Sequence, residues 1–215
     1  MITKNLFKRI ITSVLLILLL ILMYNSNKVM LISLIFISII SWLEFNKLFS
    51  KFLKKEKSKI YLLNFITFIY LSFFVLLILK IGDSQKVYFF YAVIISISTD
   101  IGGYVVGKTF KGRKLTKISP NKTISGSIGS FVFSFSIIPF FINYYNDINL
   151  YQIILITFII SLTSQLGDLM LSYLKRKSKA KDTGNFLPGH GGILDRIDGI
   201  LFAAPVGVFL FILFL

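Results

Sequence analysis

The stretch "IYLLNFITFIYLSFFVLLILK", residues 60–80, decides the fold class of this chain. It carries no charged side chain before Lys80 at its end. A helix rises about 1.5 Å per residue, so a run of this length is long enough to cross a hydrocarbon core of roughly 30 Å. The stretch therefore predicts a membrane-spanning helix.

Similar apolar runs recur on both sides of this stretch. The chain has 215 residues, of which 55% are hydrophobic, and its mean hydropathy of +0.81 is far above that of soluble domains. We expect an all-α, polytopic integral membrane protein with about seven transmembrane helices. The runs cover residues 7–24, 29–47, 60–80, 87–107, 125–143, 150–172 and 198–215.

The first run follows basic residues, as a secretory signal peptide would. However, the first alanine is Ala92, so no A-x-A cleavage site lies near this run and we expect a retained helix. The chain also has no cysteine, which excludes disulfides and thiolate metal sites.

The basic residues predict the orientation of the helices. The net charge is +15, which in a soluble protein would suggest a nucleic-acid partner. Counting spans from a cytoplasmic N-terminus, the inner segments hold 21 of the 24 lysines and arginines, and only Lys28, Lys80 and Lys86 fall outside. This positive-inside asymmetry predicts seven spans with the N-terminus in and the C-terminus out, and no nucleic-acid partner. The same charge attracts anionic headgroups and a polyphosphate substrate.

Three acidic residues lie inside apolar runs, each near the predicted cytoplasmic end: Glu44, Asp100 and Asp168. A carboxylate within a span costs several kcal/mol unless it is paired or faces a cavity, so it is a functional candidate. We favour a functional role for Asp100 and Asp168. For Glu44, pairing with a neighbouring lysine is an equal alternative.

Asp195 and Asp198 are spaced i, i+3 at the start of the last run, which places both carboxylates on one helical face. One interpretation is capping of the helix N-terminus. The other is that they converge with Asp168 on a hard cation, for which Mg²⁺ is the usual choice when phosphates complete the coordination shell. We expect Mg²⁺ at Asp168, Asp195 and Asp198 and leave a second cation open.

The glycine-rich segment "LPGHGG", residues 187–192, precedes these aspartates. Its glycines permit close backbone approach, and such a loop at a helix start can present N–H groups to a phosphate. Lys175, Arg176 and Lys181 add cationic donors nearby, so the segment indicates phosphoryl chemistry. For His190, the chain's one histidine, we favour contact with phosphate or orientation of the loop, with a structural role as the alternative.

The stretch from Ser172 to Asp198 resembles, position by position, the signature of the phosphatidate cytidylyltransferase (CDP-diacylglycerol synthase) family. That signature reads S-x-x-K-R, four residues, K-D-x-G, then P-G-H-G-G-x-x-D-R-x-D. The segment "STDIGGYVVGKTFKGRKLTKISPNKT", residues 98–123, is similar to a second family segment ending in S-P-x-K-T, and "SWLEFNKL" around Glu44 resembles a weaker feature. The family often has a glutamate where this chain has Ser125, and its typical members are longer.

The resemblance implies a Mg²⁺-dependent nucleotidyltransferase that converts CTP and phosphatidic acid into CDP-diacylglycerol and pyrophosphate. Residues 1–85 would then be N-terminal transmembrane helices, and residues 86–215 the catalytic part of one membrane domain. The implied location is the inner (plasma) membrane, with the site facing the cytoplasm, and a homodimer is left open. The predicted catalytic residues are Asp168, Asp195, Asp198, Lys175, Arg176, Lys181 and Asp182. The predicted substrate-binding residues are Asp100, Ser119, Lys122, Ser172, Gly189, His190, Gly191, Gly192 and Arg196.

Three other functions compete with this interpretation. A CTP-dependent lipid or polyprenol kinase, or a cytidylyltransferase for another lipid such as an ether lipid, would use similar chemistry. A cation or phosphate transporter is disfavoured, because its charged residues would lie at mid-membrane on broken helices rather than cluster at one face.

Overall fold

The computed structural model of the protein describes residues 4–54, 56–81, 85–144, 148–189 and 191–214. Within these residues, seven helical segments are long and apolar enough to cross a membrane, which confirms the predicted fold class. Their orientation stays a prediction. Six of the segments are the long helices α1 (Lys4–Asn25), α2 (Asn27–Phe52), α3 (Lys57–Lys80), α4 (Lys86–Phe110), α7 (Leu150–Lys177) and α8 (Leu194–Phe214), and the fifth segment, Ile124–Phe141, begins with the shorter α5 (Ile124–Phe135).

The fifth span is the one that departs most from the predicted runs. Instead of one helix over residues 125–143, helix α5 ends at Phe135 and is followed by α6 (Ile138–Phe141) and the 3₁₀ turn η2 (Ile142–Tyr144). Pro139 explains the break, because proline lacks an N–H donor and its ring clashes with the carbonyl of the preceding turn. Helix α7, by contrast, continues to Lys177 and carries the beginning of the predicted signature on a helix.

The residues group into two compact units. Unit 1 comprises Met1–Asp83 and Leu174–Ile197, and unit 2 comprises Ser84–Tyr173 and Asp198–Leu215. Helices α7 and α8 therefore contribute residues to both. The predicted division at residue 85 stays a prediction, but the segment Leu174–Ile197 groups with the N-terminal helices.

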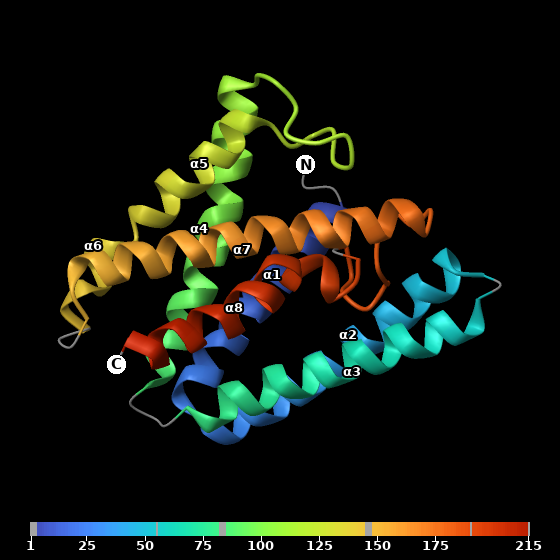
Figure 1. The fold of residues 1–215 in the computed structure, drawn as a ribbon, viewed down its shortest axis with the longest axis horizontal. Helices are drawn as coiled ribbons and strands as arrows, with labels where there is room; N and C mark the ends of the chain where they lie inside the picture. The colour runs from blue at the N-terminus through green and yellow to red at the C-terminus, as the bar shows by residue number, and fades with distance from the viewer. Residues whose placement is uncertain (1–3, 55, 82–84, 145–147, 190, 215) are drawn as a thin grey trace. The chain divides into compact units, whose positions relative to one another are not determined.

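In unit 1, helices α2 and α3 lie side by side as a hairpin (Figure 1). Polar side chains pin them together. The indole nitrogen of Trp42 donates to the carbonyl of Asn64 at 3.1 Å, and the amide of Asn64 donates to the side chain of Asn46 at 2.9 Å. Satisfying such groups internally is required where no water is present.

In unit 2, helices α4 and α5 approach closely through small residues. A Cβ atom added at Gly102 of α4 would lie 2.5 Å from the carbonyl oxygen of Gly129 on α5, and one added at Gly126 would lie 2.8 Å from that of Gly103. Small residues that let two backbones approach are typical of helix pairs in membranes.

Hydroxyl groups fasten helix α4 to α7 within the same unit. The Tyr91 hydroxyl lies 2.5 Å from that of Thr157, and the Thr99 hydroxyl donates to that of Ser161 at 3.0 Å. Tyr88, one turn before Tyr91, stacks on Phe211 of α8 with ring centroids 4.6 Å apart.

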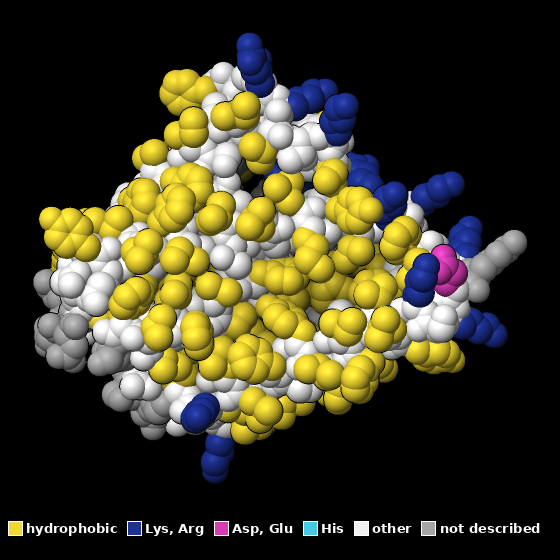
Figure 2. Space-filling model, viewed as in Figure 1, with side chains coloured by type: hydrophobic (Ala, Val, Ile, Leu, Met, Phe, Trp, Pro, Cys, Tyr) yellow, Lys and Arg dark blue, Asp and Glu magenta, His cyan; other side chains and the backbone are white. Residues whose placement is uncertain are grey.

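Large apolar side chains cover the outside of the helices. Figure 2 shows hydrophobic side chains over most of the visible face. Tyr61, Leu62 and Phe65 on α3 are examples, each with more than half of its surface exposed. A soluble protein rarely exposes so large an apolar area, so this surface fits contact with lipid.

Candidate functional site

Unit 2 contains a cavity of about 340 Å³. Its lining comes from helices α4, α5 and α7 and from the loop between α4 and α5. Five of the residues predicted to form the site lie around it: Asp100, Ser119, Lys122, Asp168 and Ser172. The structure thus brings together the second family segment and the first residue of the signature, which are far apart in the sequence.

The loop between α4 and α5 forms a small hairpin that presents Lys122 to this cavity. The amide of Leu115 donates to the carbonyl of Lys122 at 2.8 Å, and the amide of Lys122 donates to the carbonyl of Ser119 at 3.1 Å. Pro120 stands between Ser119 and Lys122, where its fixed φ suits a tight turn. Thr123 then caps α5 by accepting from the amide of Gly126 at 3.1 Å.

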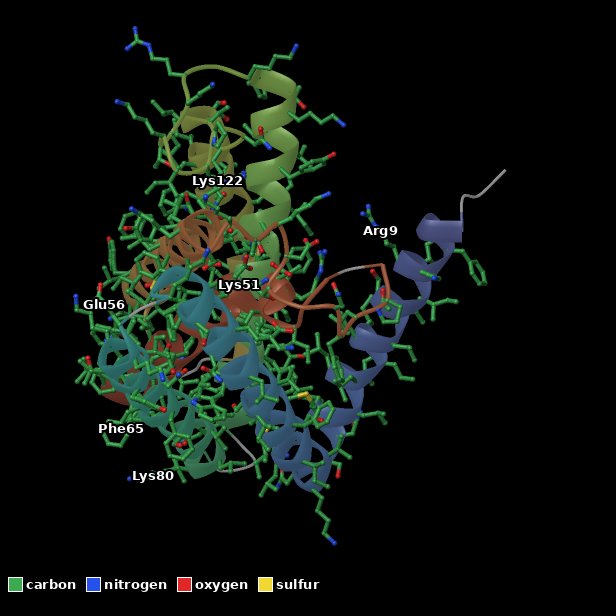
Figure 3. All side chains as sticks on the ribbon, turned by 90° about the vertical axis from the view of Figure 1, so that its right-hand side faces the viewer. Arg9, Lys51, Glu56, Phe65, Lys80 and Lys122 are labelled. Carbon is green, nitrogen blue, oxygen red and sulfur yellow. The ribbon has the colours of Figure 1, made fainter. Side chains whose placement is uncertain are left out.

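Lys122 and Asp168 form an ion pair in the cavity (Lys122 is labelled in Figure 3). The other carboxylate oxygen of Asp168 accepts from the hydroxyl of Ser172 at 3.4 Å. Asp100 lines the same cavity. Two carboxylates and one ammonium leave this group with a formal charge of −1, so a cation can be accommodated beside them and phosphate oxygens can meet Lys122.

Gln165 of α7 lines the same cavity and was missed by sequence reasoning. Its side-chain oxygen accepts from the hydroxyl of Ser127 at 2.5 Å, whereas its buried amide nitrogen has no hydrogen-bond partner among the residues that the structure describes. A buried donor without a partner costs about 1–3 kcal/mol and calls for an explanation. Its place three residues before Asp168, on the same face of α7, was the available signal.

In unit 1, Glu44 of helix α2 is 3% exposed and lies against the loop that joins α7 to α8. One of its carboxylate oxygens accepts from the amide of Ile193 at 3.0 Å. The other accepts from the amide of Leu194 at 2.9 Å and from the hydroxyl of Thr183 at 2.6 Å. Among the described residues, the hydrogen bonds of Glu44 are thus with two backbone amides and a hydroxyl.

Asp195 also binds the loop between α7 and α8, through other backbone amides. One carboxylate oxygen accepts from the amides of Thr183 and Gly192 at 2.8 and 3.0 Å. The other accepts from the ammonium of Lys175 at 2.9 Å, and the side chain of Asp195 is 7% exposed. Asp195 therefore binds the loop that precedes its own helix and an ammonium of α7.

Two glycines of the predicted phosphate loop have backbone conformations that favour glycine. Gly189 and Gly191 adopt φ of +79° and +83°, a region that side chains with a Cβ rarely enter. The carbonyl of Gly189 accepts from Nε of Arg9 at 3.0 Å, a contact that sequence reasoning missed because it counted Arg9 only as a topology signal (Figure 3).

The remaining predicted site residues are more open. Arg176, Lys181 and Arg196 are exposed, and exposed Asp182 lines a polar pocket of about 240 Å³ together with Lys47 and Lys51 of α2. Asp198, in unit 2, accepts from the amide of Gly199 at 3.0 Å. His190 lies outside the described residues, so its predicted role stays a prediction.

The predicted Mg²⁺ site stays a prediction as well. Among the residues that the structure describes, no three histidine or acidic side chains converge closely enough to hold a metal ion by themselves. The donors available in the cavity of unit 2 are carboxylates and hydroxyls, which are the ligands Mg²⁺ prefers. Mg²⁺ also keeps open positions for waters and substrate phosphates, so the chemistry of the donors fits this ion.

Comparison with known proteins places the chain among related sequences. The family model described as "Cytidylyltransferase family" matches residues 2–214. The chain is 47% identical over 129 residues to a phosphatidate cytidylyltransferase of Bacillus subtilis (strain 168), an alignment that covers 59% of this chain and 48% of the relative.

Two further relatives carry the same name. One from Staphylococcus haemolyticus (strain JCSC1435) is 44% identical over 122 residues, covering 55% of this chain and 46% of the relative. One from Rickettsia bellii (strain RML369-C) is 46% identical over 121 residues, covering 53% and 52%. The aligned part thus spans about half the length of these curated relatives.

Proposed function

The chain belongs to the cytidylyltransferase family, and on that basis we propose that it transfers the cytidylyl group of CTP to phosphatidic acid. The products would be CDP-diacylglycerol and pyrophosphate. The observation that carries the proposal is the cavity of unit 2, where Lys122, Asp168 and Asp100 from three separate segments meet. A cavity with an ammonium beside two carboxylates suits a substrate that brings phosphates and a metal ion.

The reaction needs no covalent enzyme intermediate. An oxygen of the lipid phosphate attacks the α-phosphorus of CTP, a new P–O bond forms, and the bond from the α-phosphorus to the oxygen that bridges to the β-phosphorus breaks. Pyrophosphate leaves with that bonding pair. A phosphomonoester is already largely anionic near neutral pH, since its second pKa is about 6, so no general base is required.

The side chains would then act by positioning and charge. Lys122, held by the hairpin and by Asp168, would bind phosphate oxygens in the cavity of unit 2. Lys175, Arg176 and Lys181 would neutralise the leaving pyrophosphate, and Gly189 and Gly191 would offer backbone N–H groups to phosphate. Mg²⁺, proposed at Asp168, Asp195 and Asp198, would offset the negative charge that develops on the phosphates.

We also propose that these polar segments face the cytoplasm of a cell whose inner membrane holds the chain, because 21 of the 24 basic residues fall on that side. CTP would arrive from water while the diacylglycerol part of the substrate stays in lipid. Reporter fusions after Lys57 and Lys117 should both report a cytoplasmic location. A periplasmic signal at either position would overturn the topology. A homodimer stays a prediction.

The activity is tested with the purified chain, CTP, phosphatidic acid and Mg²⁺. We expect pyrophosphate to be released in proportion to CDP-diacylglycerol. Release of CDP would instead identify a CTP-dependent lipid kinase, which uses the same nucleotide but transfers the terminal phosphate. Replacing phosphatidic acid with a dialkyl analogue tests the alternative of an ether-lipid substrate.

A further inference from the structure

The first amide groups of helix α8 donate to a side chain of another helix. The residue before α8 is Ile193, whose apolar side chain cannot accept a hydrogen bond. The first N–H groups of a helix need acceptors, which a local serine, threonine, asparagine or aspartate usually supplies. Here the amides of Ile193 and Leu194 donate to Glu44, which is about 150 residues earlier in the sequence.

We propose that Glu44 is a positioning residue for the reaction: it caps α8 from helix α2 and so fixes where Asp195 lies. This inference rests on the proposed function and adds a residue that lies outside the recognised signature. The Glu44 side chain also accepts from the hydroxyl of Thr183, whose own amide donates to Asp195. Glu44 therefore contacts both the loop and the start of α8. One carboxylate of α2 thereby fixes the loop and the helix start that carry the candidate chemistry.

A proton count supports this arrangement. The hydroxyl of Thr183 lies 2.6 Å from Glu44 and 3.1 Å from Asp195, yet it has a single proton to donate. The shorter contact assigns that proton to Glu44. Asp195 then keeps two backbone amides on one oxygen and Lys175 on the other, so the oxygen facing Lys175 retains a lone pair for a substrate-bound cation.

The burial of Glu44 explains why the contact is specific. A carboxylate that is 3% exposed is stable only if it is well satisfied, and here two amides at the start of α8 and the hydroxyl of Thr183 satisfy it. All three donate to Glu44, so a glutamine at this position would turn its NH₂ group toward an N–H in either orientation of the amide. Glu44→Gln therefore removes at least one of the three hydrogen bonds and the negative charge with almost no change in volume.

Three variants separate positioning from ordinary stabilisation. In Glu44→Gln we expect kcat to fall about 30-fold or more and the Mg²⁺ concentration for half-maximal rate to rise, with the KM for CTP changed less than about threefold. Glu44→Asp keeps the charge and should recover part of kcat. Ser178→Ala is the matched structural control, because the Ser178 hydroxyl also joins this segment to α2, through the carbonyl of Leu48 at 3.0 Å. It should lower thermal stability without moving the Mg²⁺ dependence.

Hydrogen–deuterium exchange of the purified protein gives a readout that needs no activity. The amides of Thr183, Ile193 and Leu194 should exchange faster in Glu44→Gln than in the wild type, whereas Glu56→Gln, at an exposed ion pair with Lys59, should leave them unchanged. If the wild type makes no CDP-diacylglycerol, the proposed function fails while the exchange data still test the cap. Unchanged exchange, or a Glu44→Gln variant whose Mg²⁺ dependence matches that of the wild type, would overturn the inference.

Discussion

Replacing Lys122 with methionine removes the ammonium that pairs with Asp168 while it keeps most of the side-chain volume. The side chain of Lys122 is 27% exposed and that of Asp168 is 26% exposed. The pair therefore lies between an exposed ion pair, worth about 0–1 kcal/mol, and a fully buried one, whose disruption costs about 3–5 kcal/mol. We expect the free energy of unfolding to fall by about 1–2 kcal/mol.

The effect on turnover should be larger than the effect on stability. Losing one donor that faces developing phosphate charge typically costs about 100-fold to 1,000-fold in rate. We therefore expect kcat/KM for CTP to fall by about 100-fold, or roughly 2.7 kcal/mol of transition-state stabilisation. Asp168 would also lose the cation that competes with Mg²⁺, so the Mg²⁺ concentration for half-maximal rate should fall.

The assay is CDP-diacylglycerol formation by detergent-purified protein over a Mg²⁺ series, with thermal unfolding measured on the same samples. Lys117→Met is the matched control, because Lys117 is exposed in the same hairpin and does not line the cavity. Lys122→Arg keeps the charge and should retain part of the activity. Wild-type kinetics in Lys122→Met would reduce this hairpin to a charged topology signal and refute the role assigned to the cavity.

Four further substitutions test three separate parts of the structure. Asp195→Asn and Asp198→Asn should each lower Mg²⁺-dependent turnover by about 100-fold, since each removes a charge that we propose holds the cation; near-normal rates with unchanged metal dependence would instead favour simple capping. Gly102→Ala should lower the free energy of unfolding by about 1–3 kcal/mol, because the new Cβ would lie 2.6 Å from the Cβ of Phe133. An unchanged melting temperature would contradict the close packing of α4 on α5. Gln165→Met should lower kcat/KM about tenfold while the free energy of unfolding changes by less than about 1 kcal/mol, because loss of the Ser127 bond and removal of the unpartnered amide offset each other; wild-type kinetics would remove Gln165 from the site.

The spans could be predicted because each depends on a local property, the length of an apolar run. The structure confirms all seven, and the break at Pro139 follows from a residue visible in the sequence. The acids inside the spans were also visible, since a charged residue in an apolar run stands out without any knowledge of its neighbours.

The partners of those acids could not be predicted in the same way. Glu44 meets Ile193 and Leu194 across about 150 residues, and Lys122 meets Asp168 through a hairpin whose turn sets the direction of the side chain. Periodicity within one helix carries no information about which distant segment packs against it. Gln165 was overlooked for a related reason, because an uncharged amide in a span signals less strongly than a carboxylate.

The most direct test of the central claim follows the phosphorus atoms of CTP. The purified chain is incubated with phosphatidic acid, Mg²⁺ and CTP labelled at either the α- or the γ-phosphate, and the lipid fraction is then counted. The proposed reaction predicts that the α-label enters the lipid while the γ-label leaves in pyrophosphate. Recovery of the γ-label in the lipid, or of neither label, would contradict cytidylyl transfer by this chain.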